Sequence, residues 1–353
     1  MDVGFNDSQL ELRAAVRDVL AQECPPALLR EVAADPDRWR PLWKTVVDLG
    51  WPALAALDGE AGLGVIELVA VLEELGSAAA PVPFLSTVGW AAGVLRGHGA
   101  DVVGELAEGA VAALGVGAVG DRRPLPALTW SGGRVQGTIG PVADAVRADL
   151  LVLLAAGADA DVAVVVRPGP GVELRALEAI DPTRPLTEVT VDVAAEASYE
   201  IDPRAALSLP LTAAAAELVG VTSRLLDLSV AHAASREQFG RPIGSFQGLK
   251  HRLADCYVGL ERARSLTYAA AMAVDDPGAQ TGETWRAALL AKAAASEAAV
   301  EAARTAVQVH GAMGMTREHD VHLFLRRAWQ SAALLGESRA LYADAATQLL
   351  GAR

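Results

Sequence analysis

A polar corner between two helical stretches carries side chains suited to binding an anion and the edge of a polar ring. The corner contains glutamines, arginines, glycines and a proline, and it reads Arg236-Glu237-Gln238-Phe239-Gly240-Arg241-Pro242-Ile243-Gly244-Ser245-Phe246-Gln247. Guanidinium and amide groups donate the hydrogen bonds that such ligands accept. A solvated and chemically inert connection between two helices is the alternative that the same residues allow.

A second stretch with chemical potential lies at the end of a later helical segment. It reads Gln308-Val309-His310-Gly311-Ala312-Met313-Gly314-Met315. A glycine-rich exit from a helix lets backbone amides approach a ligand closely, and the preceding glutamine adds a side-chain amide. An ordinary helix end is the alternative interpretation.

Other common catalytic and cofactor motifs lack support in the sequence. Residues 115–120 resemble a glycine fingerprint, but the charged segment 121–124 follows them instead of a helix, which argues against a dinucleotide fold. No serine lies in a nucleophile elbow. His319 and His322 are three residues apart without a cysteine nearby, and we therefore expect no metal site.

Two helical segments must position the first corner. Residues 209–235 precede it and are rich in alanine and leucine. Residues 246–263 follow it with apolar residues at three- and four-residue steps, which predicts an amphipathic helix. Gly240 and Pro242 turn the chain between the two segments, and Ser245 is the expected N-cap of the second helix.

The wider pattern predicts three domains in an α+β, mainly helical fold. Residues 1–110 are expected to form an N-terminal helical domain, whose first helix Asn6 or Asp7 can cap. Residues 111–204 contain short apolar runs separated by glycine, proline or aspartate, which predicts a small antiparallel β domain. Residues 205–353 are expected to form a C-terminal helical bundle.

The short apolar runs and the later helical segments have these predicted bounds. The strands are Val111–Val119, Ala127–Trp130, Arg134–Ile139, Leu150–Leu154, Val162–Val166 and Glu188–Val193. Beyond the first corner, the long helical segments are residues 283–309 and 321–350.

Composition limits the classes of function. The chain has 353 residues, 52% of them apolar, and a formal net charge of −14, which disfavours a nucleic-acid backbone or an anionic membrane surface as partner. No apolar stretch is long and charge-free enough to predict a membrane span. Cys24 and Cys256 form no CxxC pair and the N-terminus lacks a basic region, so we expect a reduced, cytoplasmic protein without a signal peptide.

Taken together, these features resemble the acyl-CoA dehydrogenase family over nearly the whole chain. The matching segments are Leu49-Gly50-Trp51-Pro52, Gly62-Leu63-Gly64, Leu72-Glu73-Glu74-Leu75-Gly76, Arg236-Glu237-Gln238-Phe239-Gly240 with Phe246-Gln247, and Gln308-Val309-His310-Gly311-Ala312-Met313-Gly314. The resemblance implies a helical N-terminal domain, a small middle β domain and a C-terminal four-helix bundle. It also implies α,β-desaturation of an acyl-CoA thioester, in which a carboxylate takes the α-proton and the β-hydrogen leaves as hydride to FAD.

The resemblance assigns both polar stretches to the FAD of a neighbouring subunit. Arg236 would pair with the pyrophosphate, because a guanidinium matches phosphate geometry in a bidentate way. The other residues implied to bind FAD are Gln238, Phe239, Gln247, Gln308, Gly311, Ala312 and Gly314. The resemblance further implies an acyl-CoA substrate, a tetramer with itself or with a second dehydrogenase chain, and electron-transfer flavoprotein as partner.

The sequence departs from the family at the catalytic base. The family's glutamate follows an Arg-Asp-Ala segment, whereas here 326–328 leads to Leu335 at that position, and Glu337 lies two residues later. Relatives with the base on the helix before the corner carry it at a position near Pro210, roughly 10 Å along the helix from Glu217. Glu337 and Glu217 are the candidates, and neither lies at the family's position.

The middle domain also departs from the family. Residues 117–123 and 139–144 stand where the family's flavin-cradling segments lie, but without their hydroxyl and amide donors. Motifs for a neighbour's FAD thus survive, whereas those for this chain's own flavin and base are missing. That pattern is expected of the non-catalytic partner in heteromeric dehydrogenases, such as actinobacterial enzymes acting on sterol side-chain CoA thioesters.

Two alternatives to the heteromer remain open from the sequence. One is a self-sufficient, homo-oligomeric dehydrogenase that uses Glu337 or Glu217 as a relocated base. The other is a flavin-less scaffold that kept the fold and binds an acyl-CoA or a partner protein.

Overall fold

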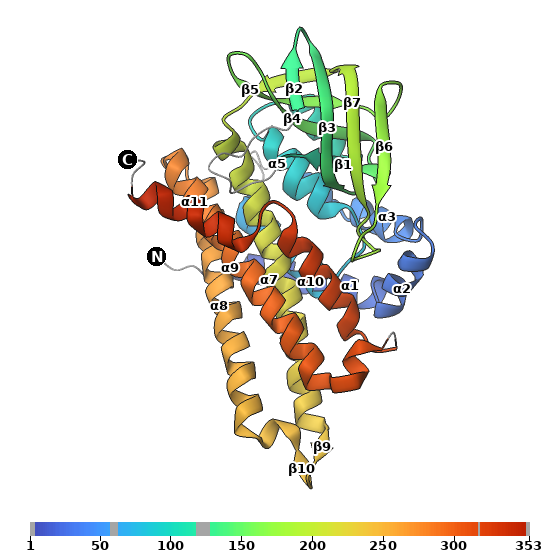
Figure 1. Ribbon diagram of the computed structural model, residues 1–353, viewed down its shortest axis with the longest axis vertical. Coiled ribbons are helices and arrows are strands. Elements are labelled where there is room, and N and C mark those ends of the chain that lie inside the picture. The colour runs from blue at the N-terminus through green and yellow to red at the C-terminus, as the bar shows by residue number, and fades with distance from the viewer. Residues whose placement is uncertain (1–3, 57–62, 118–127, 317, 351–353) are drawn as a thin grey trace.

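Three regions follow one another along the chain, as Figure 1 shows: a helical body, a β-sheet at one end of it, and long helices that project from the other end. The computed structural model describes residues 4–56, 63–117, 128–316 and 318–350. The predicted mainly helical α+β fold is confirmed. Helix α6 ends at Ala107 before the first strand begins at Ala112, and the last strand of the sheet ends at Glu200 before α7 begins at Pro203.

The N-terminal helices form the first part of the body. They are α1 (Asp7–Glu23), α2 (Pro26–Ala34), α3 (Arg40–Asp48), η1 (Trp51–Ala55), α4 (Val65–Ser77), η2 (Leu85–Ala91), α5 (Ala92–Leu95) and α6 (Ala100–Ala107). Asn6 caps α1, as predicted: its Oδ1 accepts from the Gln9 amide at 2.9 Å, and Gln9 Oε1 accepts from the Asn6 amide at 2.9 Å. This reciprocal pair satisfies two backbone donors at the start of the helix.

The middle region is one eight-stranded sheet. Its elements are β1 (Ala112–Gly115), β2 (Leu128–Ser131), β3 (Arg134–Ala143), η3 (Ala145–Arg147), β4 (Leu150–Ala156), β5 (Asp161–Val166), β6 (Val172–Leu177), β7 (Leu186–Ala194) and β8 (Ala197–Glu200). The strand order is β6-β7-β3-β2-β4-β5-β8, and β1 pairs with β4. Every strand that the sequence predicts overlaps an observed strand, with bounds shifted by a few residues; residues 118, 119 and 127 of the predicted strands lie outside the described ranges.

The prediction of an antiparallel sheet is wrong for two of the three pairings of β4, since only its pairing with β5 is antiparallel. Strand β4 pairs in parallel with both β1 and β2, because the chain crosses over through η3 before entering it. Strands β6 and β8 were not predicted. Their residues are half-buried or exposed and include Glu173, Arg175 and Glu200, so they lack the continuous apolar character of the central strands.

The C-terminal region consists of long helices joined by short turns. Its elements are α7 (Pro203–Ser235), β9 (Glu237–Gln238), β10 (Arg241–Pro242), η4 (Ile243–Ser245), α8 (Gln247–Asp275), α9 (Thr281–His310), η5 (Gly311–Met315), α10 (Val321–Ala333) and α11 (Ser338–Leu350). Phe246, not Ser245, occupies the N-cap position of α8, because Ser245 belongs to the preceding 3-10 turn. The single helix expected over 321–350 is broken at Leu335 and Gly336, both of which have a positive φ.

Helix α7 is the central element of the fold. Among the described residues it alone is long and apolar enough to span a bilayer, yet 94% of its most apolar window is buried inside the protein, as expected of a core helix. It packs closely on α4: a Cβ added to Gly220 would lie 1.9 Å from the Glu73 carbonyl oxygen, and one added to Gly76 would lie 2.1 Å from that of Glu217. Glycine at both positions lets the two backbones touch.

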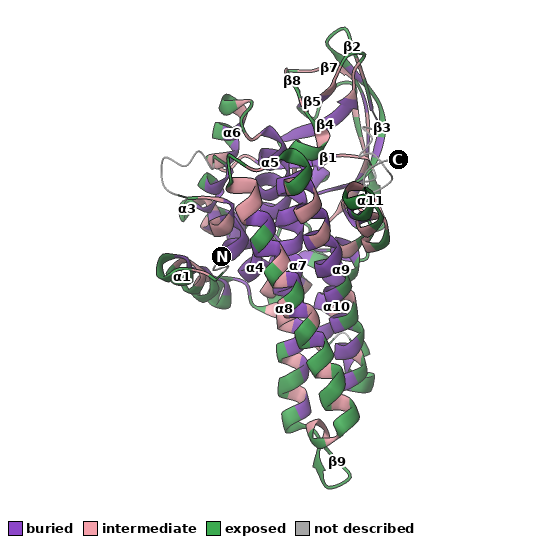
Figure 2. Ribbon diagram, turned by 90° about the vertical axis from the view of Figure 1, so that its left-hand side faces the viewer, coloured by how far each residue is buried: buried purple, intermediate pink, exposed green. Residues whose placement is uncertain are grey.

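The far ends of α7, α8 and α9 form an arm that projects from the body. Figure 2 shows that burial decreases from the body toward the end of this arm, where β9 lies. Helices α8 and α9 pack against each other and against α7 along its length. The arm thus presents the polar corner at a surface that the chain itself leaves uncovered.

Helix α9 contains a fully buried lysine. The Nζ of Lys292 donates to Ser296 Oγ at 2.9 Å and to the Ala332 carbonyl oxygen at 3.1 Å, near the end of α10. Neither partner is a carboxylate. Burial lowers the pKa of Lys292 to about 7, because removing an ammonium from water disfavours its charged form.

We expect the stability of the K292M variant to depend less on pH than the stability of the wild type. An unfolded lysine keeps its proton up to about pH 10, whereas folded Lys292 releases it near pH 7, so wild-type stability rises with pH between these values. The difference between wild-type and K292M unfolding free energies should change by about 2 kcal/mol between about pH 7 and pH 9 in urea melts. K250M, at an exposed lysine, is the matched control. Identical pH profiles for wild type and K292M would contradict the prediction.

Candidate functional site

The first polar stretch forms a short hairpin at the end of the arm. Helix α7 stops at Ser235, and Arg236 leaves the helix with an extended backbone (φ −76°, ψ 122°). Strands β9 and β10 pair across a tip formed by Phe239 and Gly240, both with a positive φ. Phe239 is 90% exposed, although large aromatic side chains are usually buried. Its ring stands edge-on to that of Phe246, with centroids 6.0 Å apart.

The polar side chains of this hairpin differ in what they contact. Arg236 is exposed, and its guanidinium has no carboxylate partner among the residues that the structure describes. The guanidinium of Arg241 stacks over the Phe246 ring at 4.2 Å, and the Gln238 amide donates to the neighbouring Glu237 carbonyl at 2.8 Å. The Arg236 guanidinium thus contacts neither a carboxylate nor a ring among the described residues, whereas that of Arg241 lies against Phe246.

The second polar stretch ends α9. Gln308, Gly311 and Ala312 are exposed, and Gly311 leaves the helix with φ 61° and open space where a Cβ would be. Gly314 differs, because it is buried and a Cβ there would lie 3.2 Å from Val307 Cα. The structure therefore places Gly314 as a packing residue of the turn. Gln247, the remaining predicted residue, is exposed at the start of α8.

A ring contact brings the two stretches together. His232 lies one helical turn before Arg236, and His310 lies directly before Gly311; their imidazoles stack with centroids 4.3 Å apart. The His319 ring also contacts that of His310, with centroids 4.5 Å apart and the ring planes tilted by 57°. His310 and His319 are named in the sequence analysis, but the ring contacts were not predicted, because nothing in the spacing of the histidines links α7 to the end of α9.

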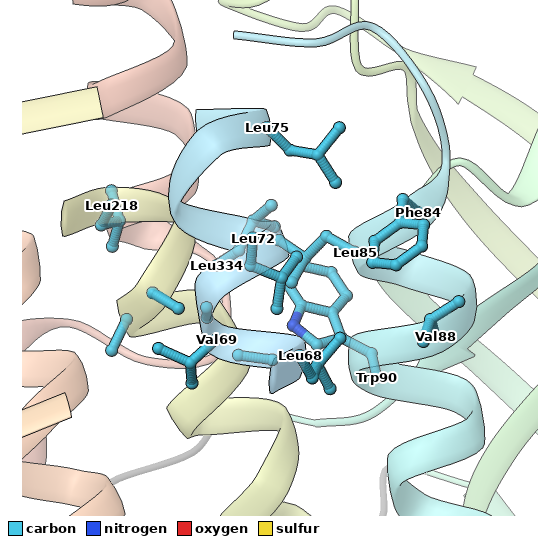
Figure 3. Packing of buried hydrophobic residues seen from close by; sticks show 14 of the residues in the cluster. Leu68, Val69, Leu72, Leu75, Phe84, Leu85, Val88, Trp90, Leu218 and Leu334 are labelled. Atoms are coloured by element: carbon cyan, nitrogen blue, oxygen red, sulfur yellow. The ribbon is translucent and has the colours of Figure 1, made fainter. Parts of the chain in front are cut away.

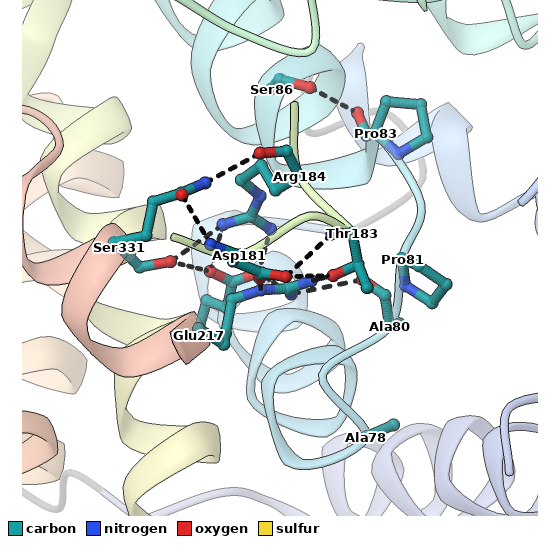
Figure 4. Close-up of polar contacts among 12 residues, drawn as sticks. Ala78, Ala80, Pro81, Pro83, Ser86, Asp181, Thr183, Arg184, Glu217 and Ser331 are labelled. Atoms are coloured by element: carbon teal, nitrogen blue, oxygen red, sulfur yellow. Dashed lines mark hydrogen bonds and ion pairs between the residues drawn. The ribbon is translucent and has the colours of Figure 1, made fainter. Parts of the chain in front are cut away.

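Glu217, a candidate base, lies in a buried ionic network. Figure 4 shows it among residues of α7, α10 and the loop between β6 and β7. Arg184 bonds to both of its carboxylate oxygens, Arg327 Nη1 lies 3.3 Å from Oε1, and Ser331 Oγ donates to Oε2 at 3.2 Å. Burial raises the pKa of the Glu217 carboxyl, but Arg184 and Arg327 outweigh burial and hold that pKa below its ordinary value.

The same network continues to the β6–β7 loop. Arg327 Nε bonds to Asp181 Oδ2, and Arg327 Nη2 donates to Thr183 Oγ1 at 2.9 Å. Gln330 contributes to the loop as well, because its Nε2 donates to the Arg184 carbonyl at 2.8 Å. The network connects the sheet to α7 and α10. Its arginines donate hydrogen bonds to the carboxylates of Glu217 and Asp181.

Glu337, the other candidate, lies at the break between α10 and α11. Its side chain is exposed, and its carbonyl oxygen accepts from the Ala340 and Leu341 amides, which starts α11. Leu335, at the family's base position, is half-buried with φ 58°. The neighbouring Leu334 is buried among residues of α4 and η2, including Leu72, as Figure 3 shows.

The predicted flavin-cradling segment at residues 139–144 contains one acidic side chain, which is engaged inside the protein. Asp144 is buried, and its Oδ2 accepts from Ser86 Oγ at 2.9 Å while its Oδ1 accepts from Arg147 Nη1 at 3.1 Å. These contacts fix the turn onto η2. Residues 118–123 of the other predicted flavin-cradling segment lie outside the described residues.

Comparisons with known proteins agree with this architecture. The description "Acyl-CoA dehydrogenase, N-terminal domain" matches residues 6–103, and "Acyl-CoA dehydrogenase, C-terminal domain" matches residues 207–352. Acyl-CoA dehydrogenase IpdE2 of Mycolicibacterium smegmatis is 32% identical over 340 residues, which cover 93% of this chain and 94% of the relative. Acyl-CoA dehydrogenase FadE27 of Mycobacterium tuberculosis is 32% identical over 367 residues, which cover 95% of each.

Solved structures show the same likeness. A variant of the Tcur3481-Tcur3483 steroid ACAD superimposes with a TM-score of 0.87 at 27% identity over 98% of both chains. The ChsE4-ChsE5 complex from Mycobacterium tuberculosis superimposes with a TM-score of 0.85 at 28% identity over 100% of both chains. With both helical regions matched and relatives above 30% identity spanning nearly the whole length, the chain belongs to the acyl-CoA dehydrogenase family.

Proposed function

We propose that the chain is a subunit of a FAD-dependent acyl-CoA dehydrogenase and contributes half of the FAD site to a catalytic partner chain. One contrast carries the proposal. At the end of the arm, Arg236 and the exit from α9 lie together and exposed, whereas the family's base position holds Leu335. A binding half-site is kept and the catalytic carboxylate is absent from its position.

The end of the arm fits FAD, the cofactor of the family. Arg236 has no carboxylate partner among the described residues and would hold the pyrophosphate through two parallel hydrogen bonds. Phe239 offers an exposed aromatic face, while Gln308 and the open side of Gly311 offer amide groups. FAD, when bound, supplies the hydride acceptor; the residues of this chain bind and orient it.

The chain's own catalytic region supports a non-catalytic role. Helices η2, α5 and α7 are in direct contact at the level where some relatives carry the base: a Cβ added to Gly93 would lie 2.7 Å from a methyl carbon of Leu209 and 3.3 Å from Pro210 Cδ. One added to Gly89 would lie 2.9 Å from Ala213 Cβ. Pro210, which stands near that position here, has no group that can take a proton, so the base is missing at this level as well.

Neither candidate glutamate compensates for the missing base. Glu217 accepts hydrogen bonds from Arg184 and Ser331 inside the network, so its lone pairs are engaged and its basicity is reduced. Removing an α-proton needs a base within hydrogen-bond reach of the substrate. Glu337 is exposed to solvent at the start of α11. We assign Glu217 a structural role.

The solved relatives support a heteromer. Two of the most similar structures are described by paired names, Tcur3481-Tcur3483 and ChsE4-ChsE5, and the second is described as a complex. By the same likeness we propose an acyl-CoA substrate, a tetrameric assembly in the cytoplasm and electron-transfer flavoprotein as the electron acceptor. The acyl group is left open.

The visible spectrum tests the proposal. The chain expressed alone is expected to purify without stoichiometric flavin and without turnover of acyl-CoA substrates. Co-expressed with a dehydrogenase chain that carries the family's glutamate, it is expected to yield a yellow complex with one FAD for each pair of chains. A homo-oligomer with stoichiometric FAD and turnover would overturn the proposal in favour of a self-sufficient enzyme.

A further inference from the structure

Three imidazoles lie against one another where the two polar stretches meet: those of His232 and His310 are stacked, and that of His319 is tilted against His310. This group of three rings is called the stack below. We propose that His232, His310 and His319 are positioning residues, which in their uncharged state hold the Arg236 corner and the Gly311–Met315 turn together. The inference rests on the proposed function in one respect: it treats the corner and the turn as the two parts of one FAD half-site. The stack itself is a property of the isolated chain.

The geometry ties three separate segments to one another. His310 lies in the middle, with ring centroids 4.3 Å from His232 on α7 and 4.5 Å from His319 before α10. His310 is buried, and its Nδ1–H donates to the Ala306 carbonyl oxygen at 2.7 Å, which fixes the ring's orientation. His319 Nδ1 accepts from the Val321 amide at 3.3 Å and must be unprotonated to do so.

The charged groups next to the stack include one cation and one carboxylate that is already paired with an arginine. Arg236 on α7 adds positive charge next to His232. Asp320 follows His319, but Arg30 of α2 already bonds to its carboxylate at 2.6 Å. His322 on α10 donates from Nδ1 to the His319 carbonyl at 2.6 Å and faces the same segment.

Protonation therefore opposes the stack. Two charged imidazoles slightly more than 4 Å apart repel each other, and because His310 is buried, little water screens the repulsion on its side. Burial is the largest cause that lowers the pKa of His232 and of His310, and neighbouring histidines lower both further. Arg236 adds to the effect on His232, whereas the hydrogen bond to the Ala306 carbonyl partly opposes the lowering for His310. A locally opened form binds more protons, so opening is favoured as the pH falls through about 6.5 and below.

Hydrogen–deuterium exchange of the full chain, read by mass spectrometry, tests this assignment. The reporter is the peptide that contains the Gly311–Met315 turn, measured at about pH 5.5 and about pH 7.5 with rates corrected for intrinsic exchange. For the wild type we expect protection of the turn to fall by about tenfold at the lower pH. His232→Phe keeps an aromatic ring that cannot be protonated, and protection should then change little with pH.

Two further variants complete the test. His232→Ala removes the ring, so the turn should exchange about tenfold faster at both pH values. His98→Phe is the matched control, because His98 contacts Tyr199 in another part of the molecule, and it should behave like the wild type. Wild-type protection that is independent of pH, or protection in His232→Ala equal to the wild type, would overturn the assignment. Neither the pH dependence of exchange nor the effect of the variants requires bound flavin, so both can be measured even if the chain binds none.

Discussion

Replacing Glu217 by alanine is expected to lower the free energy of unfolding by about 3–5 kcal/mol. The side chain is buried between Arg184 and Arg327, and both arginines would remain buried without their shared carboxylate. An uncompensated buried charge costs far more than the pair itself contributes. Urea unfolding of the full chain near pH 7, followed by circular dichroism, measures the change.

An exposed ion pair provides the matched control. Arg175 and Glu188 pair at 2.8 Å on adjacent strands β6 and β7, with side chains 60% and 34% exposed. Removing that carboxylate in Glu188→Ala should change stability by less than about 1 kcal/mol, because water solvates both charges. A loss below about 1 kcal/mol for Glu217→Ala as well would contradict the structural role of the network.

The same network predicts how the stability of the protein depends on Glu217 at acidic pH. The folded pKa of this carboxyl is depressed, so its contribution is fully present above the unfolded pKa, which is about 4.3, and is lost as the pH falls through the lower folded pKa. In Glu217→Gln this carboxyl group is replaced by an amide, which does not titrate. The stability of that variant should therefore fall less steeply with acid than wild-type stability does.

Sequence reasoning predicted the elements with strong local patterns. Alanine- and leucine-rich periodicity identified α7 and α8, and the glycines after His310 marked the end of α9. Strand β6 has no such pattern, because its residues are half-buried or exposed. The parallel pairing of β4 depends on a crossover, which local spacing does not encode.

The two halves of the candidate site differ in how far sequence could identify them. The Arg236 and Gln308 stretches are contiguous motifs, so their residues were named from sequence alone. The partners of Glu217 are distant in the chain: Arg184 is 33 residues away, Arg327 is 110 and Ser331 is 114. Only packing of α7 and α10 against the β6–β7 loop brings them together. For this reason Glu217 could be considered as a base from its helix position, although its surroundings indicate otherwise.

Replacing Arg236 by alanine is expected to weaken FAD binding about 100-fold in the complex that this chain forms with its catalytic partner. A bidentate pair with pyrophosphate consists of two charge-assisted hydrogen bonds, and losing both removes about 2.7 kcal/mol. Arg236 is exposed at a free helix end, so the fold should be unaffected. The measurement is the FAD content of the gel-filtered complex, with flavin fluorescence to determine the Kd.

A second arginine of the same hairpin distinguishes the effect of positive charge from the effect of a specific pyrophosphate contact. Arg241 stacks on the Phe246 ring, and Arg241→Ala removes an equal charge without touching the proposed pyrophosphate contact. FAD content in that variant should stay near the wild-type value. FAD content in Arg236→Lys should lie between those of the wild type and Arg236→Ala, because an ammonium keeps the charge but lacks the paired donors of a guanidinium. Equal losses of FAD in Arg236→Ala and Arg241→Ala would indicate that the overall positive charge of the hairpin, and not a specific contact, attracts the cofactor. An unchanged FAD content in Arg236→Ala would favour the flavin-less scaffold, since a partner-binding surface has no need for a guanidinium aimed at phosphate.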